Sequence, residues 1–261
     1  MQARGILLDL EGVLYQGDDA LPGTADAAKA LSGSGFEIRY LTNTTTQPRK
    51  TIADRLADMG FELEAEHIFT PPLAATRLLK RDHVERIHLA TAPGLAVDLS
   101  GFELVDDHPE AVVLGDLYLD FTWHRLNEIF QMLQQGARLV ALHKNRYCRR
   151  GQGIALDLGP LVAALEYASG ITAEIVGKPS PTFFNLALDD LGLTASDVVM
   201  VGDDLEADIG GAKAVGMQTI QVETGKYRPS DLHHPSIQPD RRIASAMELP
   251  QILISDVCKP K

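Results

Sequence analysis

The chain has 261 residues, of which 45% are hydrophobic and 23% are charged, a balance typical of soluble globular proteins. The formal net charge of −12 argues against nucleic-acid binding, which usually requires a basic face. No apolar run approaches the length of a membrane span. The first apolar run is interrupted by Asp9 and Glu11, unlike a signal peptide. We therefore expect a cytoplasmic protein with neither a nucleic-acid nor a membrane partner.

Short apolar runs alternate with helical patterns along the first and middle parts of the chain. In the first part, the spacing predicts strands over residues 6–10, 37–41 and 68–69 and helices over residues 48–59 and 73–80. In the middle part, it predicts strands over residues 87–90, 112–114 and 139–142 and helices over residues 123–135 and 160–169. Trp123 is expected to fill a core, because a large aromatic side chain gains most from burial.

The last part of the chain shows the same alternation of short apolar runs and helical patterns as the first part. Ser180 is predicted to cap a helix that ends at Leu191, before Gly192. A strand over residues 198–201, a helix over 205–215, a strand over 219–222 and a closing helix over 244–254 follow. Alternating strands and helices indicate βαβ units and a parallel sheet. The predicted fold class is α/β.

Two of the predicted strands end at carboxylates, although they lie far apart in the sequence. Asp9 closes the first strand, and Asp203 and Asp204 follow the strand over residues 198–201. If the two strands are neighbours, the carboxylates repel each other and lose hydrating water. A hard cation such as Mg²⁺ offsets both the repulsion and the lost hydration, because it binds carboxylate oxygens. The sequence therefore predicts a metal-assisted site at the carboxyl edge of a parallel sheet, where ligands bind in open α/β sheets.

The domain organisation follows from the same acids, because they flank the middle section of the chain. We predict a core domain made of residues 1–80 and 178–261, a Rossmann-like doubly wound parallel sheet. Residues 81–177 are predicted to form an inserted α/β cap domain. This arrangement allows the cap to serve as a lid over the site.

Other polar residues at strand and helix ends complete a set suited to phosphoryl transfer. Thr42 and Asn43 follow the strand over residues 37–41, Lys178 precedes the helix capped by Ser180, and Asp208 lies one helical turn after Asp204. Transfer of a charged phosphoryl group depends on positioning and charge stabilisation. A carboxylate can act as the nucleophile, with Mg²⁺ and lysine offsetting the charge.

These motifs, over residues 9–14, 41–43, 177–179 and 202–204, resemble the four motifs of the haloacid dehalogenase superfamily of phosphatases. The α/β insert is similar to the type-II cap of one subgroup. The segments over residues 121–127, 164–168, 176–181 and 224–231 resemble the branch of phospholysine phosphohistidine inorganic pyrophosphate phosphatases and related hydrolase-domain proteins. The resemblance implies a hydrolase of phosphoric monoesters, pyrophosphate or phosphoamides that acts on a small phosphorylated metabolite.

The resemblance also implies a role for each site residue. Asp9 would be the nucleophile, which forms an aspartyl-phosphate, and a Mg²⁺ ligand. The other metal ligands would be the main-chain carbonyl of residue 11 and Asp203. The phosphate would be bound by Thr42, Asn43 and Lys178, of which Lys178 also counts as catalytic. The supporting residues that hold the metal shell or orient the lysine would be Asp204 and Asp208.

One position departs from the family pattern. Superfamily phosphatases usually carry aspartate two residues after the nucleophile as the general acid/base, where this chain has Glu11. A misplacement of about 1 Å can lower a rate ~100-fold. The alternative function is therefore a weakly catalytic or non-catalytic protein that binds phosphometabolites on the same fold. A dehalogenase or phosphonatase is disfavoured by the motif set and the cap type.

The basic loop over residues 143–150, from His143 to Arg150, leaves two interpretations open. It either meets an anionic leaving group or is a solvated surface turn. Because caps of this kind can mediate dimers, a homodimer is also left open. The sequence does not name the physiological substrate.

Overall fold

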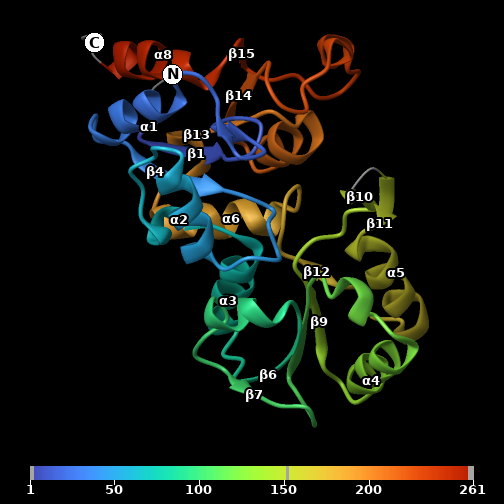
Figure 1. Ribbon diagram of the computed structural model, residues 1–261. Coiled ribbons are helices and arrows are strands. Elements are labelled where there is room, and N and C mark those ends of the chain that lie inside the picture. The colour runs from blue at the N-terminus through green and yellow to red at the C-terminus, as the bar shows by residue number, and fades with distance from the viewer. Residues whose placement is uncertain (1–2, 151–152, 258–261) are drawn as a thin grey trace. The chain divides into compact units, whose positions relative to one another are not determined.

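The computed structural model describes residues 3–150 and 153–257. The chain divides into two compact units (Figure 1). The first comprises residues 1–42, 49–69 and 178–261, and the second comprises residues 43–48 and 70–177. The predicted core domain extends to residue 80, whereas helix α3 (Pro71–Arg81) belongs to the second unit of the structure.

The first unit is built on a six-stranded parallel sheet with the order β15-β14-β13-β1-β4-β5. Its strands are β1 (Gly5–Asp9), β4 (Glu37–Leu41), β5 (Ile68–Phe69), β13 (Val198–Gly202), β14 (Gln218–Val222) and β15 (Arg241–Ile243). Strand β1 pairs with both β4 and β13. All residues of β1 and β13 are buried, as expected for apolar runs covered by helices on both faces. The two ends of the chain therefore share one sheet.

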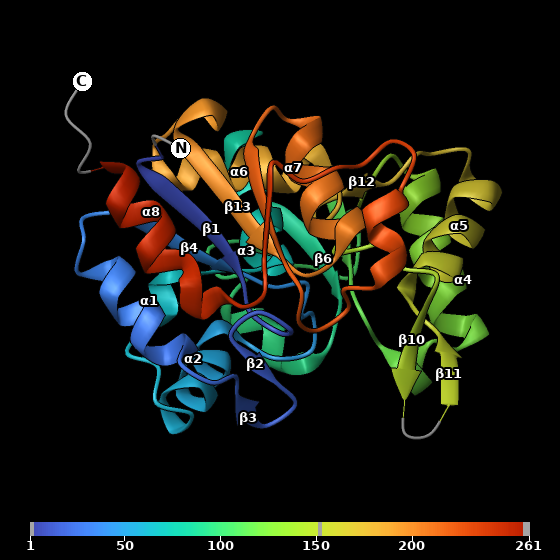
Figure 2. The ribbon, with the colours of Figure 1, turned by 90° about the horizontal axis from the view of Figure 1, so that it is seen from above.

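Helices cover both faces of this sheet (Figure 2). The helices of the first unit are α1 (Thr24–Ser32), α2 (Arg49–Asp58), α6 (Pro181–Leu191), α7 (Gly211–Ala214) and α8 (Leu249–Val257). Apolar residues of α1, α2 and α8 pack in one core cluster with one face of the sheet. On the other side, the ring of Phe183 in α6 packs edge-on against Phe69. The α/β class and the doubly wound parallel sheet are confirmed.

The predicted strand bounds in the first unit agree with the structure to within one residue, but three helices differ. Helix α1 was missed, because its sequence Thr24–Ser32 buries mainly alanines rather than large apolar residues. The helix predicted over residues 205–215 is a π-helix, η5 (Leu205–Gly210), followed by the short α7. The closing helix α8 begins at Leu249 rather than at residue 244. The N-cap is confirmed, because the Ser180 side chain accepts a hydrogen bond from the Thr182 N–H.

The second unit has its own five-stranded parallel sheet with the order β12-β9-β8-β6-β7. Its strands are β6 (Arg86–Ala90), β7 (Glu103–Leu104), β8 (Ala111–Leu114), β9 (Arg138–Ala141) and β12 (Glu174–Ile175). Helices α4 (Trp123–Gln134) and α5 (Leu158–Ser169) pack against it in a separate core cluster. The prediction that Trp123 fills a core is wrong, because 83% of its surface is exposed.

The described residues also include two short antiparallel hairpins outside the two parallel sheets. Strands β2 (Tyr15–Gln16) and β3 (Asp19–Ala20) pair in the first unit. In the second unit, β10 (Tyr147–Arg150) pairs antiparallel with β11 (Gly153–Leu156), so the end of the basic loop is a strand. His143, at the start of that loop, is buried, and Lys144 forms an ion pair of 2.6 Å with Glu166. Among the residues that the structure describes, no helix combines the length and apolar character needed to span a bilayer.

Candidate active site

The parallel pairing of β1, β4 and β13 brings three chain segments to one edge of the sheet. Leu8 lies opposite Val201, and Asp9 lies opposite Leu41. Asp203 follows the last residue of β13, and Thr42 follows the last residue of β4. Because neighbouring parallel strands end at the same edge, Asp9 lies one residue beyond the Leu8–Val201 pair and Asp203 two residues beyond it, at the same edge of the sheet.

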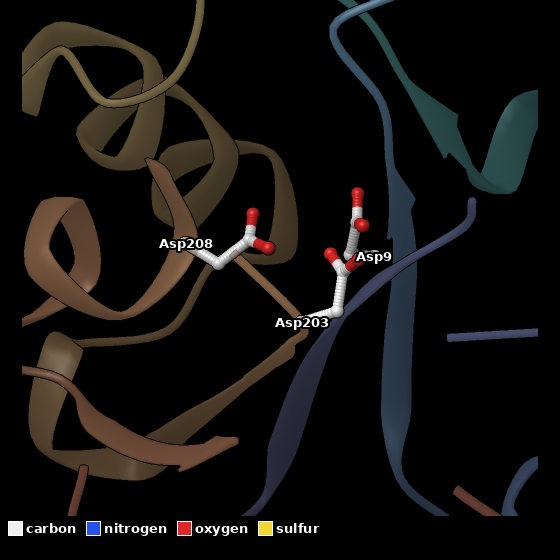
Figure 3. Close-up of side chains that lie close together, drawn as sticks. All are labelled: Asp9, Asp203 and Asp208. Atoms are coloured by element: carbon white, nitrogen blue, oxygen red, sulfur yellow. The ribbon is translucent and has the colours of Figure 1, made fainter. Parts of the chain in front are cut away.

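Three buried carboxyl groups converge at this edge (Figure 3). One oxygen from each of Asp9, Asp203 and Asp208 lies within 4.8 Å of the others. Asp9 is at the end of β1, Asp203 follows β13, and Asp208 is in η5. Gly202 permits this approach, because a Cβ there would overlap the Asp208 side chain. Asp9 and Asp203 are the carboxylates predicted as metal ligands, whereas Asp208 was predicted only as a supporting residue.

Lys178 lies among these acids and is itself 5% exposed. Its Nζ donates a hydrogen bond to Asp9 Oδ1 and another, of 2.6 Å, to Asp208 Oδ1. The second oxygen of Asp208 accepts the main-chain N–H of Asp204 at 3.1 Å. Asp208 therefore bonds through both of its oxygens, one to Lys178 and one to the segment after β13, and its supporting role stays a prediction.

Burial and charge set the protonation of this cluster. Burial raises the pKa of Asp9, although the Lys178 charge opposes the effect. Burial and the Asp208 charge raise the pKa of Asp203 to about 6. Burial and the Asp9 charge raise the pKa of Asp208 to about 7. Burial favours the neutral amine of Lys178, but Asp208 and Asp9 outweigh it and raise the pKa of the lysine, so it stays charged. One lysine does not neutralise three acids.

Asp203 offers an unused oxygen. Its side chain is 1% exposed, and its Oδ1 is buried with no hydrogen-bond partner in the described part of the chain. A buried carboxylate oxygen without a partner is costly. A hard cation fits this site, since Mg²⁺ is held by carboxylates and carbonyls and keeps some of its water. The donor set therefore suits Mg²⁺, with Asp9 and Asp203 as the carboxylates that would hold it, together with the Glu11 carbonyl that the sequence resemblance implies.

Asp204 has a structural role beside the cluster. Its Oδ1 accepts the N–H groups of Glu206 at 3.1 Å and Ala207 at 2.9 Å, which caps η5. Burial acts to raise the pKa of Asp204, but the bond from Ala207 and the charge of Lys226 lower it below its ordinary value. Asp204 is therefore charged at neutral pH. The π-helical turn that it caps is a feature often found at functional sites.

Glu11 lies in a tight loop directly after β1. Its side chain is exposed, and its main chain forms an isolated bridge with Tyr15. The Gly12 N–H donates to the Tyr15 carbonyl at 2.7 Å, and Gly12 has a φ of +88°, which glycine adopts most readily. The loop conformation therefore depends on the main chain and on Gly12, and within the described part of the chain the Glu11 side chain contributes no bond that shapes it.

Thr42 is buried at the end of β4 in the first unit, whereas Asn43 is the first residue of the second unit. Their phosphate-binding roles stay predictions. Asp9, Asp203 and Lys178 were predicted from the sequence, but no role was predicted for the segment Thr224–Lys226, which is bonded to the loop after β1 and to Asp203 after β13. The N–H of Lys226 donates to Asp203 Oδ2 at 2.6 Å, and the Thr224 hydroxyl donates to the Gly12 carbonyl. A signal was available, because Thr-Gly-Lys follows a predicted strand of the same sheet.

Comparison with known proteins agrees with this geometry. A haloacid dehalogenase-like hydrolase model matches residues 6–104, and a HAD-hydrolase-like model matches residues 175–249. Human phospholysine phosphohistidine inorganic pyrophosphate phosphatase is 38% identical over 98% of this chain and 96% of its own. Human haloacid dehalogenase-like hydrolase domain-containing protein 2 is 43% identical over 87% of each chain.

Solved structures show the same fold. The p-nitrophenyl phosphatase from Archaeoglobus fulgidus has a TM-score of 0.89 and 26% identity, covering 97% of this chain and 100% of that one. NagD from E. coli K-12 has a TM-score of 0.86 and 27% identity, covering 95% and 98%. The chain belongs to the haloacid dehalogenase-like hydrolase family. Within that family it falls in the phosphatase branch indicated by the sequence resemblance, and it is a phosphatase.

Proposed function

We propose that this phosphatase is Mg²⁺-dependent and hydrolyses a small phosphorylated metabolite through an aspartyl-phosphate on Asp9. The observation that carries the proposal is the buried oxygen of Asp203, which has no partner among the described residues and belongs to the same three-acid cluster as Asp9. A cation at this place would use that oxygen and offset the charge left over by Lys178. Buried charges in proteins are normally paired or coordinate metals, so a cation accounts for the excess of acids at this strand edge.

The chemical tasks then divide among the residues as follows. A carboxylate oxygen of Asp9 attacks phosphorus, an O–P bond forms, and the bond to the leaving group breaks. Bound Mg²⁺ would supply the positive charge that lets two anions meet. Lys178 holds Asp9 through its hydrogen bond and stabilises charge on the phosphoryl oxygens. Glu11 protonates the leaving group and then activates the water that releases phosphate from Asp9.

The names of the relatives suggest the substrate class. A human relative is named for phospholysine, phosphohistidine and inorganic pyrophosphate, and one solved structure is named as a p-nitrophenyl phosphatase. We therefore propose phosphoamides and pyrophosphate as the first substrates to test, with 4-nitrophenyl phosphate as a general probe. The second unit would act as the cap that excludes water and selects the leaving group.

The test compares Asp9→Asn with Asp26→Asn, an exposed acid of helix α1 that serves as the matched control. Hydrolysis of 4-nitrophenyl phosphate is measured with Mg²⁺ and with EDTA. We expect EDTA to abolish turnover, Asp9→Asn to lower kcat by about 10³-fold or more, and the control to match the parent. Acid-quenched protein incubated with ³²P-labelled substrate should carry label only when Asp9 is present. Equal turnover by the Asp9→Asn variant and the parent would refute the assignment of Asp9 as the nucleophile.

The alternative function, a weakly catalytic or non-catalytic phosphometabolite-binding protein, is favoured by one observation. The exposed Glu11 side chain is one methylene longer than the usual aspartate and forms no bond that fixes its position in the described loop. The distinguishing measurement is turnover across a panel of phosphorylated metabolites, together with the affinity for inorganic phosphate in the presence of Mg²⁺. Tight phosphate binding without turnover of any panel member would favour the alternative.

A further inference from the structure

The segment Thr224–Lys226, which follows β14, is bonded both to the loop after β1 and to Asp203 of the acid cluster. Its Thr224 hydroxyl donates to the main-chain carbonyl of Gly12, next to the Glu11 carbonyl expected to face the metal. Two residues later, the Lys226 N–H donates to Asp203 Oδ2 at 2.6 Å. One short segment is thus bonded to the loop after β1 and to the acid after β13.

The segment and the two loops approach so closely that there is no space for a side chain at Gly225 or at Gly12. A Cβ at Gly225 would overlap Asp203 Oδ2 and lie 2.6 Å from the Gly12 Cα. A Cβ at Gly12 would likewise overlap the Asp203 carboxylate and lie 3.1 Å from the Gly225 Cα. Both glycines have positive φ, +88° at Gly12 and +61° at Gly225. The two main chains therefore meet at the Asp203 carboxylate, an approach that only glycine permits.

The bonds divide the Asp203 carboxylate between two tasks. Oδ2 is held by the Lys226 main-chain N–H, while Oδ1 is the buried oxygen without a partner in the described residues. A carboxylate with one oxygen fixed cannot rotate freely, so the direction of the other is set. The buried Gln221 side chain adds a contact of 3.5 Å to the Asp203 carbonyl. The side chain of Lys226 instead donates to Asp204 at 3.1 Å, so its ammonium group and its main-chain N–H form hydrogen bonds to different acids.

We propose that Thr224 and Gly225 are positioning residues, which set the affinity for the divalent cation by fixing the Asp203 carboxylate against the loop of residues 10–13. The proposal rests on the proposed function, because it takes Asp203 and the Glu11 carbonyl as ligands. Neither residue touches the reacting atoms. Their effect is on metal affinity, and turnover at saturating Mg²⁺ is kept.

The first variant removes one hydrogen bond without changing shape. Thr224→Val keeps the volume of threonine and deletes the donor to the Gly12 carbonyl, while Thr224→Ser keeps the hydroxyl. Mg²⁺ affinity is measured by isothermal titration calorimetry in the absence of substrate. We expect Thr224→Val to bind about fivefold to tenfold more weakly, the factor that corresponds to one neutral hydrogen bond, and Thr224→Ser to bind like the parent. In kinetics, the Mg²⁺ concentration for half-activation rises and kcat at saturation is unchanged.

The second variant tests the close approach with a matched control. Gly225→Ala places a methyl group against Asp203. Gly216→Ala introduces a comparable strain, at a φ of +84°, where no described residue other than the two chain neighbours lies within 4 Å of the new Cβ. We expect Gly225→Ala to weaken Mg²⁺ binding by more than tenfold and Gly216→Ala to leave it unchanged. Lys226→Met keeps the main-chain N–H and removes a positive charge, so it should bind Mg²⁺ no more weakly than the parent.

The outcomes separate the two proposals. A parent protein that binds no Mg²⁺ in the titration overturns both the metal-dependent function and the positioning role. A parent that binds Mg²⁺ while Thr224→Val and Gly225→Ala bind equally well overturns the positioning role alone. Weakening by Gly216→Ala as large as that by Gly225→Ala would show that strain, not contact with Asp203, is responsible, and would also overturn it.

Discussion

The buried lysine is the point at which stability and catalysis in this site are most closely linked. Lys178 is 5% exposed, and its Nζ donates to Asp9 Oδ1 and to Asp208 Oδ1. Lys178→Met preserves the length and much of the volume of the side chain but removes the charge. The variant leaves the acids of the cluster facing one another without the cation that separates them.

The expected loss of stability follows from burial. Removing one partner of a buried ion pair typically costs about 3–5 kcal/mol, because an uncompensated charge stays buried. Its pH dependence has a definite sign. The pKa of Asp208 is already raised from 3.8 to about 7, so its contribution to stability is present below pH 3.8 and lost as pH rises through 7. Without Lys178 the pKa values of Asp9 and Asp208 rise further, so the loss is larger at pH 7.5 than at pH 5.

Urea unfolding at pH 5 and pH 7.5, without metal, measures this effect. The control is Lys29→Met, which breaks an exposed ion pair with Glu62 and should change stability little. We expect Lys178→Met to lower the unfolding midpoint strongly at pH 7.5 and less at pH 5. If the two lysine variants lose equal stability, or if the Lys178→Met loss grows toward acid pH, the charge argument for the cluster is refuted.

Three further predictions concern neighbouring residues. Glu11→Asp should lower kcat on 4-nitrophenyl phosphate about tenfold if the site is built for the longer carboxylate, and a large rise would instead favour the weakly catalytic alternative. Excess Mg²⁺ should raise the melting temperature more at pH 7.5 than at pH 5, because the pKa of Asp203 is about 6 and its protonated form does not ligate; equal shifts would contradict Asp203 as a ligand. Gly202→Ala should cost about 1–3 kcal/mol by crowding Asp208, whereas Gly33→Ala, at a helical φ of −71° with no contact under 3.5 Å, should cost nothing in urea unfolding.

The predictable part of the fold is the part governed by strong local patterns. Uninterrupted apolar runs marked β1 and β13, and the Ser180–Gly192 bracket marked α6 to the residue, because caps have side-chain signatures. Helix α1 was missed, because small alanines give no clear apolar stripe. The π-helical turn of η5 was also missed, because an apolar pattern does not distinguish one extra residue in a helical turn.

The site was predictable from sequence only where residues would be energetically unfavourable on their own. Acids that follow apolar strands repel one another unless a counter-charge is present, and this argument identified Asp9 and Asp203. The segment Thr224–Lys226 holds Asp203 through the main-chain N–H of Lys226, and such a bond has no residue-type signature other than the glycine beside it. Lys178 was foreseen as a phosphate ligand, but its simultaneous bonds to Asp9 and Asp208 depend on burial, which a lone lysine in the sequence does not indicate.

Position 11 is expected to serve in two ways, through its main-chain carbonyl toward the metal and through its side chain in proton transfer. Glutamate in place of the usual aspartate changes only the side chain. The loop after β1 is shaped by main-chain bonds, the Gly12 N–H to Tyr15 at 2.7 Å and the Leu14 N–H to Leu10 at 2.8 Å, and by the positive φ of Gly12. None of these depends on the side chain of Glu11, so the carbonyl that would face the metal keeps its place whatever residue stands there. Proton transfer, in contrast, depends on the reach of that side chain. Metal affinity and turnover should therefore respond independently to changes at this position, and a Glu11→Gln variant that binds Mg²⁺ like the parent while losing kcat would demonstrate it. Loss of both together would mean that the loop is held by the Glu11 side chain after all.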